Sequence, residues 1–179
     1  MLFCVWETRV EDYETYARAE GREWEKPFFE QGPTHPAVNV SWEDAKAFCE
    51  WLTKTEREKG LIGSTQSYRL PRDLEWSVAV GLNEPKAGTP REKSAKTPDV
   101  YPWGTQWPPP KGAWNYAPSL SVDSFSVTSP VGSFAENRHG LFDLGGNVWE
   151  WCDDWYDPKQ ECRVLRGGSW CNDYPRVLL

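Results

Sequence analysis

Twelve tryptophans are spread along this chain of 179 residues, together with 14 glycines and 15 prolines. Large aromatic rings favour burial, while glycine and proline interrupt regular elements, so we expect rings packed between turns and few long helices. The length fits one core with long loops, because compact domains most often contain about 100 to 150 residues. The prediction is one loop-rich domain over residues 1–179.

Charge and cysteine content limit the partners and the compartment. The formal net charge is −7 and the 20 lysines and arginines form no basic stripe, so we expect neither nucleic acid nor an anionic membrane surface as a partner. No apolar run is long enough to span a bilayer, and the N-terminus turns polar at Glu7, before a signal peptide could be completed. Five cysteines without a CxxC pair favour a reducing compartment such as the cytoplasm.

The first 21 residues predict a short strand followed by a helix. Residues 2–6 are apolar and look like the strand. Thr8 and Glu11 then form a capping box, which begins a helix that ends at Gly21.

Two further helices are predicted from capping residues and apolar spacing. One begins at Ser41 and ends at Gly60, and the next has Pro71 in its first turn and ends at Gly81. The residues expected on their buried faces are Ala45, Phe48, Cys49 and Leu52 in the longer helix, and Leu74 and Val78 in the shorter one.

The second half of the chain lacks helical spacing. Residues 83–111 are rich in proline, glycine, lysine and threonine and are interpreted as a long surface excursion without a helix. Short apolar pieces then alternate with glycine turns and predict strands or ribbons at 131–134, 140–155 and 163–170. Helices that precede strands favour an α+β fold.

The chain contains six characteristic sequence blocks. They are HPAVNVSWEDAKAFCEWL (35–52), YRLPRDLEWSVAV (68–80), YPWG (101–104), PVGSF (130–134), GLFDLGGNVWEW (140–151) and RVLRGGSW (163–170). In this order they resemble the formylglycine-generating enzymes, the sulfatase-modifying-factor family. The resemblance implies a C-type-lectin-like fold, here incomplete at both ends because the family has a further strand before LFCVW and a closing strand after RGGSW. A truncated reading frame is the favoured interpretation, and it would leave a sheet edge unpaired.

Two calcium sites follow from the resemblance and from residue chemistry. The glycine loop at 143–150 brings carboxylates and free carbonyl groups together, and calcium prefers such hard oxygen ligands. The residues implied for this site are Asp143, Gly146, Val148 and Glu150. A solvated acidic turn that includes Asp153 and Asp154 is the alternative. A second implied site comprises Asn115, Tyr116, Gly132 and Phe134, and it lacks a charged ligand because Gly132 replaces the family's aspartate.

The resemblance also implies where an oxidase would hold copper(I), which prefers soft thiolate ligands. The family's oxidases carry cysteines three and eight residues after the serine of the RGGSW block, and these positions hold Asn172 and Val177. Cys171 lies one residue early, where a strand-like segment would point its side chain elsewhere. As a catalytic thiol it would need Cys152 or Cys162 as its partner. We therefore expect no copper site.

Four residues are candidates for ligand binding. Trp149 and Ser169 match family positions near the substrate cleft, and Trp170 and Asn172 begin the surface after the RGGSW block. A core strand position is the alternative for Trp149. Arg166 either pairs with a carboxylate or is solvated. The two histidines lie in separate loops, which excludes the three-histidine iron site of ergothioneine-synthesising relatives.

The sequence therefore predicts a non-catalytic binding module for a protein, peptide or small ligand, with calcium as its structural cofactor. Three alternatives remain: an oxidase that uses Cys171 with another thiol, a display domain of the kind diversified by retroelements after the RGGSW block, and a purely structural domain. The resemblance further implies that such domains occur fused to others, such as kinases.

Overall fold

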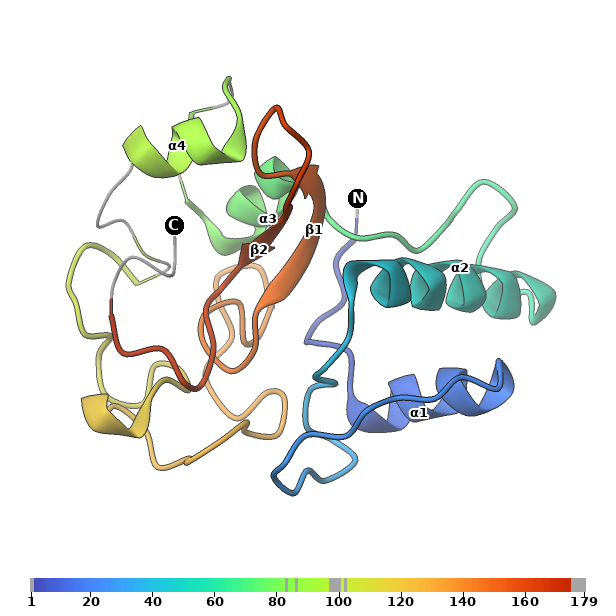
Figure 1. Cartoon of the computed structure of the whole chain (residues 1–179), viewed down its shortest axis with the longest axis horizontal. Coiled ribbons are helices and arrows are strands. Elements are labelled where there is room, and N and C mark those ends of the chain that lie inside the picture. Colours follow the sequence, from blue (N-terminus) through green and yellow to red (C-terminus); the bar gives the residue numbers. More distant parts are fainter. Residues whose placement is uncertain (1, 83, 86, 97–100, 102, 175–179) are drawn as a thin grey trace.

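The computed structural model describes residues 2–82, 84, 85, 87–96, 101 and 103–174 (Figure 1). The helices are α1 (Val10–Ala19), α2 (Trp42–Glu58), α3 (Asp73–Val80) and α4 (Pro90–Lys96), followed by the 3₁₀ turn η1 (Pro118–Leu120) and the strands β1 (Glu150–Trp155) and β2 (Arg163–Arg166). The predicted loop-rich α+β class is confirmed. Within these described ranges, no helix has the length and apolar character needed to cross a membrane.

The two strands form an antiparallel hairpin in the middle of the molecule (Figure 1). Glu150 pairs with Arg166 and Trp155 with Arg163, with an irregularity in the ladder between these ends. Helix α3 packs against β1, whereas α1 and α2 lie side by side on the other flank (Figure 1). The predicted strands at 131–134 and 140–149 are wrong, because these residues form turns and loops.

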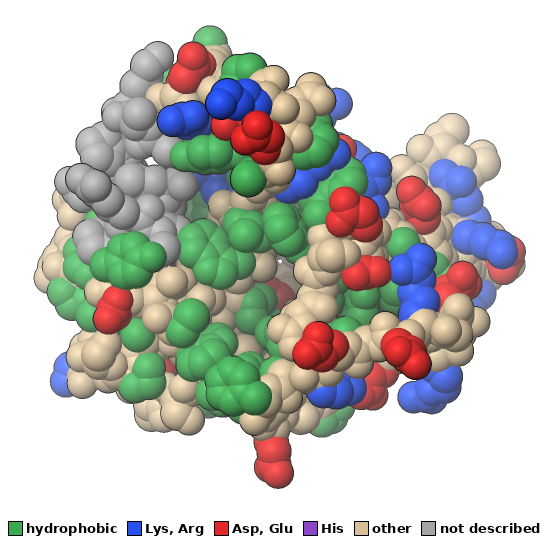
Figure 2. Space-filling model, in the orientation of Figure 1, with side chains coloured by type: hydrophobic (Ala, Val, Ile, Leu, Met, Phe, Trp, Pro, Cys, Tyr) green, Lys and Arg blue, Asp and Glu red, His purple; other side chains and the backbone are tan. Residues whose placement is uncertain are grey.

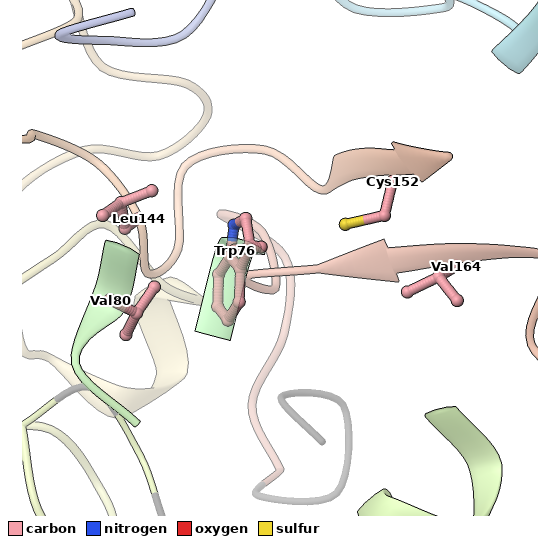
Figure 3. Close-up of a cluster of buried hydrophobic side chains, with 5 residues drawn as sticks. All are labelled: Trp76, Val80, Leu144, Cys152 and Val164. Atoms are coloured by element: carbon pink, nitrogen blue, oxygen red, sulfur yellow. The ribbon is translucent and has the colours of Figure 1, made fainter. Parts of the chain in front are cut away.

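The hairpin and α3 enclose one hydrophobic cluster. Its buried members are Trp76, Val80, Leu144, Cys152 and Val164. Figure 3 shows the Trp76 indole in the middle, with Leu144 and Val80 on one side and Cys152 and Val164 on the other. Cys152, which follows Trp149 and Trp151 in the chain, is fully buried and serves as a small hydrophobic residue of the core.

Two further clusters consist mainly of aromatic rings. One contains Tyr13, Tyr16 and Phe48 with Trp24 and Trp51 against them, and the other contains Tyr101, Tyr116 and Val122 with Trp103, Trp107 and Trp114 against them. The second cluster confirms the expectation of rings packed between turns, whereas most rings of the first belong to α1 and α2. The prediction of a surface excursion without a helix at 83–111 is wrong, since the segment contains α4 and its Tyr101 is only 3% exposed.

The caps explain where α1 and α2 begin. Ser41 caps α2 as predicted, because its Oγ accepts the Asp44 N–H at 3.1 Å. The predicted Thr8 cap of α1 and the strand at 2–6 are wrong. The Thr8 carbonyl accepts the Ala37 N–H at 2.8 Å and Arg9 forms an isolated bridge with Pro36, so the extended chain continues to Arg9 before the helix can begin.

The buried face of α3 differs from the prediction. Val78 is 60% exposed and Leu74 is half-buried, whereas the buried residues at helical spacing are Asp73, Trp76, Ser77 and Val80. Pro71 precedes the N-cap and lies outside the helix. Apolar spacing failed here because two positions of the buried face are polar and contact other buried polar groups.

Those polar groups belong to a buried ion cluster around Arg166. Its Nε donates to Asp73 Oδ1 at 2.7 Å and its Nη2 to Glu84 Oε2 at 3.0 Å, and Lys93 Nζ donates to Asp73 Oδ2 at 3.2 Å. Arg166 is 2% exposed, so pairing with carboxylates is the correct alternative for this residue. A buried guanidinium needs such partners, and they attach the end of β2 to α3.

Candidate functional site

The loop before β1 makes an unusually close backbone approach. Asp143, Gly146 and Asn147 all have positive φ angles of 57°, 77° and 58°. A Cβ at Gly146 would lie 2.3 Å from the carbonyl oxygen of Asn115, so only glycine fits this position without movement of the backbone. The Asn147 N–H donates to the same carbonyl at 2.8 Å. The glycine therefore lets the loop lie directly against residue 115.

The side chain of Asn147 connects four segments of the chain. Its Oδ1 accepts from the Ser129 N–H at 2.9 Å and from Asn115 Nδ2 at 3.2 Å, and its Nδ2 donates to Glu7 Oε2 at 2.7 Å. Glu7 Oε1 also accepts the Val148 N–H at 3.3 Å. Asn147 is 1% exposed, and these bonds supply the partners that a buried amide requires. Glu7 was missed by sequence reasoning because it lies 140 residues away.

Three carboxyl groups gather around this loop: those of Glu7, Asp143 and Glu150. Burial, then the nearby Asp143 and Glu150 charges, raise the pKa of Glu7 well above its ordinary value. Burial also raises the pKa of Asp143, and it raises the pKa of Glu150 to about 8. Each negative charge is therefore costly here unless a cation accompanies it.

The four positions of the first implied calcium site lie in this loop and at the first residue of β1. Asp143 Oδ2 accepts the Gly132 N–H at 2.6 Å, and Glu150 accepts the indole N–H of Trp76. In the part of the chain that the structure describes, no three acidic, histidine or cysteine side chains converge on a metal position. The donor types at these four positions, two carboxylates and two backbone carbonyl oxygens, are hard ligands of the kind that calcium prefers.

The second implied calcium site is only partly assembled. Asn115 and Tyr116 are fully buried, and Asn115 Oδ1 has no hydrogen-bond partner among the described residues. Gly132 is exposed and offers no carboxylate, while the ring centroids of Phe134 and Phe125 lie 6.0 Å apart. The site lacks the charged ligand that the sequence already predicted to be missing, so calcium at this position stays a prediction.

The segment after β2 is held by backbone hydrogen bonds to the same loops. The Gly167 carbonyl accepts the Gly146 N–H at 2.8 Å and the Tyr116 hydroxyl at 3.2 Å. The Trp170 N–H donates to the Asn147 carbonyl at 2.9 Å. The RGGSW block is therefore positioned by the glycine loop.

Within this segment the side chain of Asn172 is buried, whereas that of Cys171 is exposed. Asn172 is 9% exposed, and its Oδ1 accepts from the Ser169 N–H at 2.7 Å and the Ser169 hydroxyl at 2.9 Å. Cys171 is exposed, with its Sγ 3.3 Å from Ser169 Oγ. The inward position therefore holds an amide. Val177, the second position of the family's cysteine pair, lies outside the described residues.

Aromatic rings form a row beside this segment. Trp170 contacts Phe29 at 5.4 Å between ring centroids, and Phe29 contacts Phe28 at 5.2 Å. Phe28 is 90% exposed, whereas Trp149 and Trp170 are half-buried. Figure 2 shows hydrophobic side chains with few charges on the face that the segment crosses. Sequence reasoning missed Phe28 and Phe29, which precede the first recognisable block.

Cys152, Cys162 and the two histidines occupy separate environments. Cys152 lies in the hydrophobic cluster of the hairpin, and Cys162 is exposed just before β2 begins. His35 Nδ1 contacts Thr128 Oγ1 at 3.0 Å, and His139 contacts Arg138. These four residues form no common metal site in the described ranges.

Comparison with known proteins gives consistent matches. A family model described as "Sulfatase-modifying factor enzyme 1-like domain" matches residues 4–178. The chain is 35% identical over 147 residues to "Inactive C-alpha-formylglycine-generating enzyme 2" of Mus musculus, covering 75% of this chain and 37% of that protein. It is 30% identical over 187 residues to "Formylglycine-generating enzyme" of Streptomyces coelicolor, covering 88% of this chain and 51% of that protein. The chain thus spans at most about half the length of these two relatives.

A solved structure agrees with these matches. The structure of PvdO from Pseudomonas aeruginosa superposes with a TM-score of 0.64 at 26% identity, covering 92% of this chain and 66% of that one. The fold that the six sequence blocks implied is therefore confirmed.

The close approach at Gly146 can be tested by substitution. Gly146→Ala should lower the free energy of unfolding by about 1 to 3 kcal/mol beyond the cost of a left-handed alanine, because its methyl group would overlap the Asn115 carbonyl. Gly112→Ala is the matched control, since Gly112 has a similar φ of 74° with no atom near its Cβ position, and it should lose only about 1 to 2 kcal/mol. Urea unfolding measures both variants, and equal losses would contradict the close approach.

Proposed function

This chain belongs to the sulfatase-modifying factor enzyme 1-like domain family, and from that membership and its site we propose a binding module without formylglycine-generating oxidase activity. One observation carries the proposal: the inward side chain after Ser169 is the amide of Asn172, at a position where the family's oxidases carry a cysteine. An amide oxygen is a hard donor and does not suit copper(I). The likeness to a mouse relative named as inactive supports the same conclusion.

Formylglycine-generating oxidation is the second candidate, and the contact of Cys171 with Ser169 favours it. Such an oxidase would need another thiol beside Cys171. Cys152 is fully buried in the core, and burial raises the pKa of its thiol well above the ordinary value. Cys162 precedes β2, whereas Cys171 follows the other end of that strand. Burial therefore argues against Cys152 as the partner of Cys171, and separation along β2 argues against Cys162.

The ligand of the proposed module would contact the surface around the RGGSW block. Trp149, Ser169, Trp170 and Asn172 are the proposed contacts, and the aromatic row Phe28–Phe29–Trp170 extends that surface. Exposed rings supply large contact areas with little loss of side-chain entropy, which suits a protein, a peptide or a small molecule.

The oxidase alternative is tested by turnover of a cysteine-containing peptide with oxygen and copper(I). We expect no aldehyde product from the wild-type chain and no thiol-dependent copper binding, because the inward thiol pair is missing. The variants Cys171→Ser and Cys4→Ser are compared, the latter as a control at an exposed thiol that is not a candidate partner. Aldehyde formation that Cys171→Ser abolishes and Cys4→Ser preserves would overturn the proposal.

Calcium is the proposed structural cofactor of the glycine loop. The support is the desolvated Asp143 and Glu150 carboxyl groups in a turn that also carries the Gly146 and Val148 carbonyls. A bound cation would neutralise these charges and stabilise the loop that positions Trp170. The residues of this chain would thereby keep the ligand surface in place, with no part in a chemical step.

Calcium should therefore raise the melting temperature of this chain. A ligand at a hundredfold excess over its Kd stabilises a protein by about 2.7 kcal/mol, which corresponds to about 5 to 10 °C at this size. Glu150→Gln should remove most of that shift, whereas Glu136→Gln, at an exposed position outside the site, should retain it. Thermal unfolding with and without calcium checks this, and an unchanged shift in Glu150→Gln would refute the assignment.

A further inference from the structure

A second cluster of charged and aromatic side chains lies at the other end of the hairpin, where β1 stops and β2 begins. A surface pocket of about 470 Å³ opens there. Its lining residues are Trp42, Lys46, Arg72, Asp153, Asp154, Trp155 and Arg163. None of them belongs to the candidate site around the RGGSW block, so this pocket is independent of the function proposed above.

The guanidinium group of Arg163 is held between two indole rings. Its Cζ lies 3.6 Å from the ring centroid of Trp42 and 3.5 Å from that of Trp155. Trp42 is itself fixed, because its Nε1 donates to the Cys152 carbonyl at 3.1 Å. The guanidinium is planar and both rings contact it, so its hydrogen bonds are made at its edge.

The edge of this guanidinium is only partly used. Arg163 Nη1 donates to the Asp153 carbonyl at 2.8 Å, and this is a backbone contact that leaves the positive charge unneutralised. Lys46 Nζ lies 4.9 Å from the Trp42 ring centroid and adds a second cation to the same wall. Arg72 supplies a third cation at the pocket margin.

The charge of the pocket is positive and incompletely paired. Neither Lys46, Arg72 nor Arg163 forms an ion pair within the ranges that the structure describes. Of the two acids, Asp154 is engaged elsewhere, because its Oδ2 accepts the Asp73 N–H at 2.6 Å. Arg166, on the same strand as Arg163, is by contrast neutralised by two buried carboxylates. The lining therefore carries three cations against two aspartates, which leaves it with a net positive charge.

We propose that this pocket binds the carboxylate group of a ligand, from either a free organic acid or an acidic peptide side chain. A planar guanidinium edge matches the two oxygens of a carboxylate, and the Lys46 ammonium group adds a charge-assisted hydrogen bond. With three cations and two aspartates, the lining is balanced by a single negative charge, which is the charge of a carboxylate. The indole faces provide apolar walls for the carbon chain that carries it.

The test uses NMR titration of the full chain, observing the indole N–H signals of Trp42 and Trp155. The probes are acetate, a capped peptide with a single glutamate, and inorganic phosphate. Lys46→Gln removes one cation without disturbing the stacked Arg163. Lys54→Gln is the matched control, because Lys54 is an exposed lysine of the same helix that does not line the pocket.

Both carboxylate probes should shift these two signals, and the affinity should fall about tenfold in Lys46→Gln while Lys54→Gln binds like wild type. Tighter binding of the peptide than of acetate would identify a peptide as the source of the carboxylate, and equal binding would identify a free acid. Equal affinities of the two variants, or tighter binding of phosphate than of either carboxylate, would overturn the proposal. Arg163→Gln provides a second variant, and its fold is checked by the aliphatic core signals.

Discussion

The candidate site depends on the hydrogen bonds of the Asn147 side-chain amide. It joins the N-terminal segment at Glu7, the turn at Ser129 and the loop at Asn115, while its backbone carbonyl accepts the Trp170 N–H. These segments contain no strand that could order them by ladder hydrogen bonds. A loop-rich core must instead satisfy its buried polar groups one by one, and a central amide with two donors and a two-lone-pair acceptor can serve several loops at once.

A second buried polar cluster fixes the other side of the site. Arg166 and Asp73 attach the end of β2 to α3, and the Trp76 indole connects that helix to Glu150. The glycines of the RGGSW block therefore connect β2, which is positioned by ion pairs, to a loop that is positioned by Asn147. Between these anchors, Ser169 and Asn172 have little freedom, because the Asn172 carbonyl also accepts the Ala117 N–H at 3.1 Å. The family's scaffold is thus retained, with the Asn172 amide held against Ser169.

Sequence reasoning succeeded where local rules decide and failed where distant contacts decide. The start of α2 followed from Ser41, and the family followed from six blocks in order. The predicted buried face of α3 was wrong because Asp73 and Ser77 are buried through contacts with other polar groups, which apolar spacing cannot detect. Glu7 and the aromatic row could not be placed in the site, since nothing local connects them with residues more than a hundred positions away. The calcium ligands and the ligand surface remain predictions.

We propose that this chain keeps the scaffold of a formylglycine-generating enzyme and carries Asn172 and Val177 at the positions of the family's copper-binding thiols. The most direct test is copper(I) titration of the wild-type chain beside the double variant Asn172→Cys, Val177→Cys, which restores both cysteines at the family's spacing. We expect tight, thiol-dependent copper(I) binding in the double variant and none in the wild type. Wild-type binding as tight as that of the double variant would contradict it.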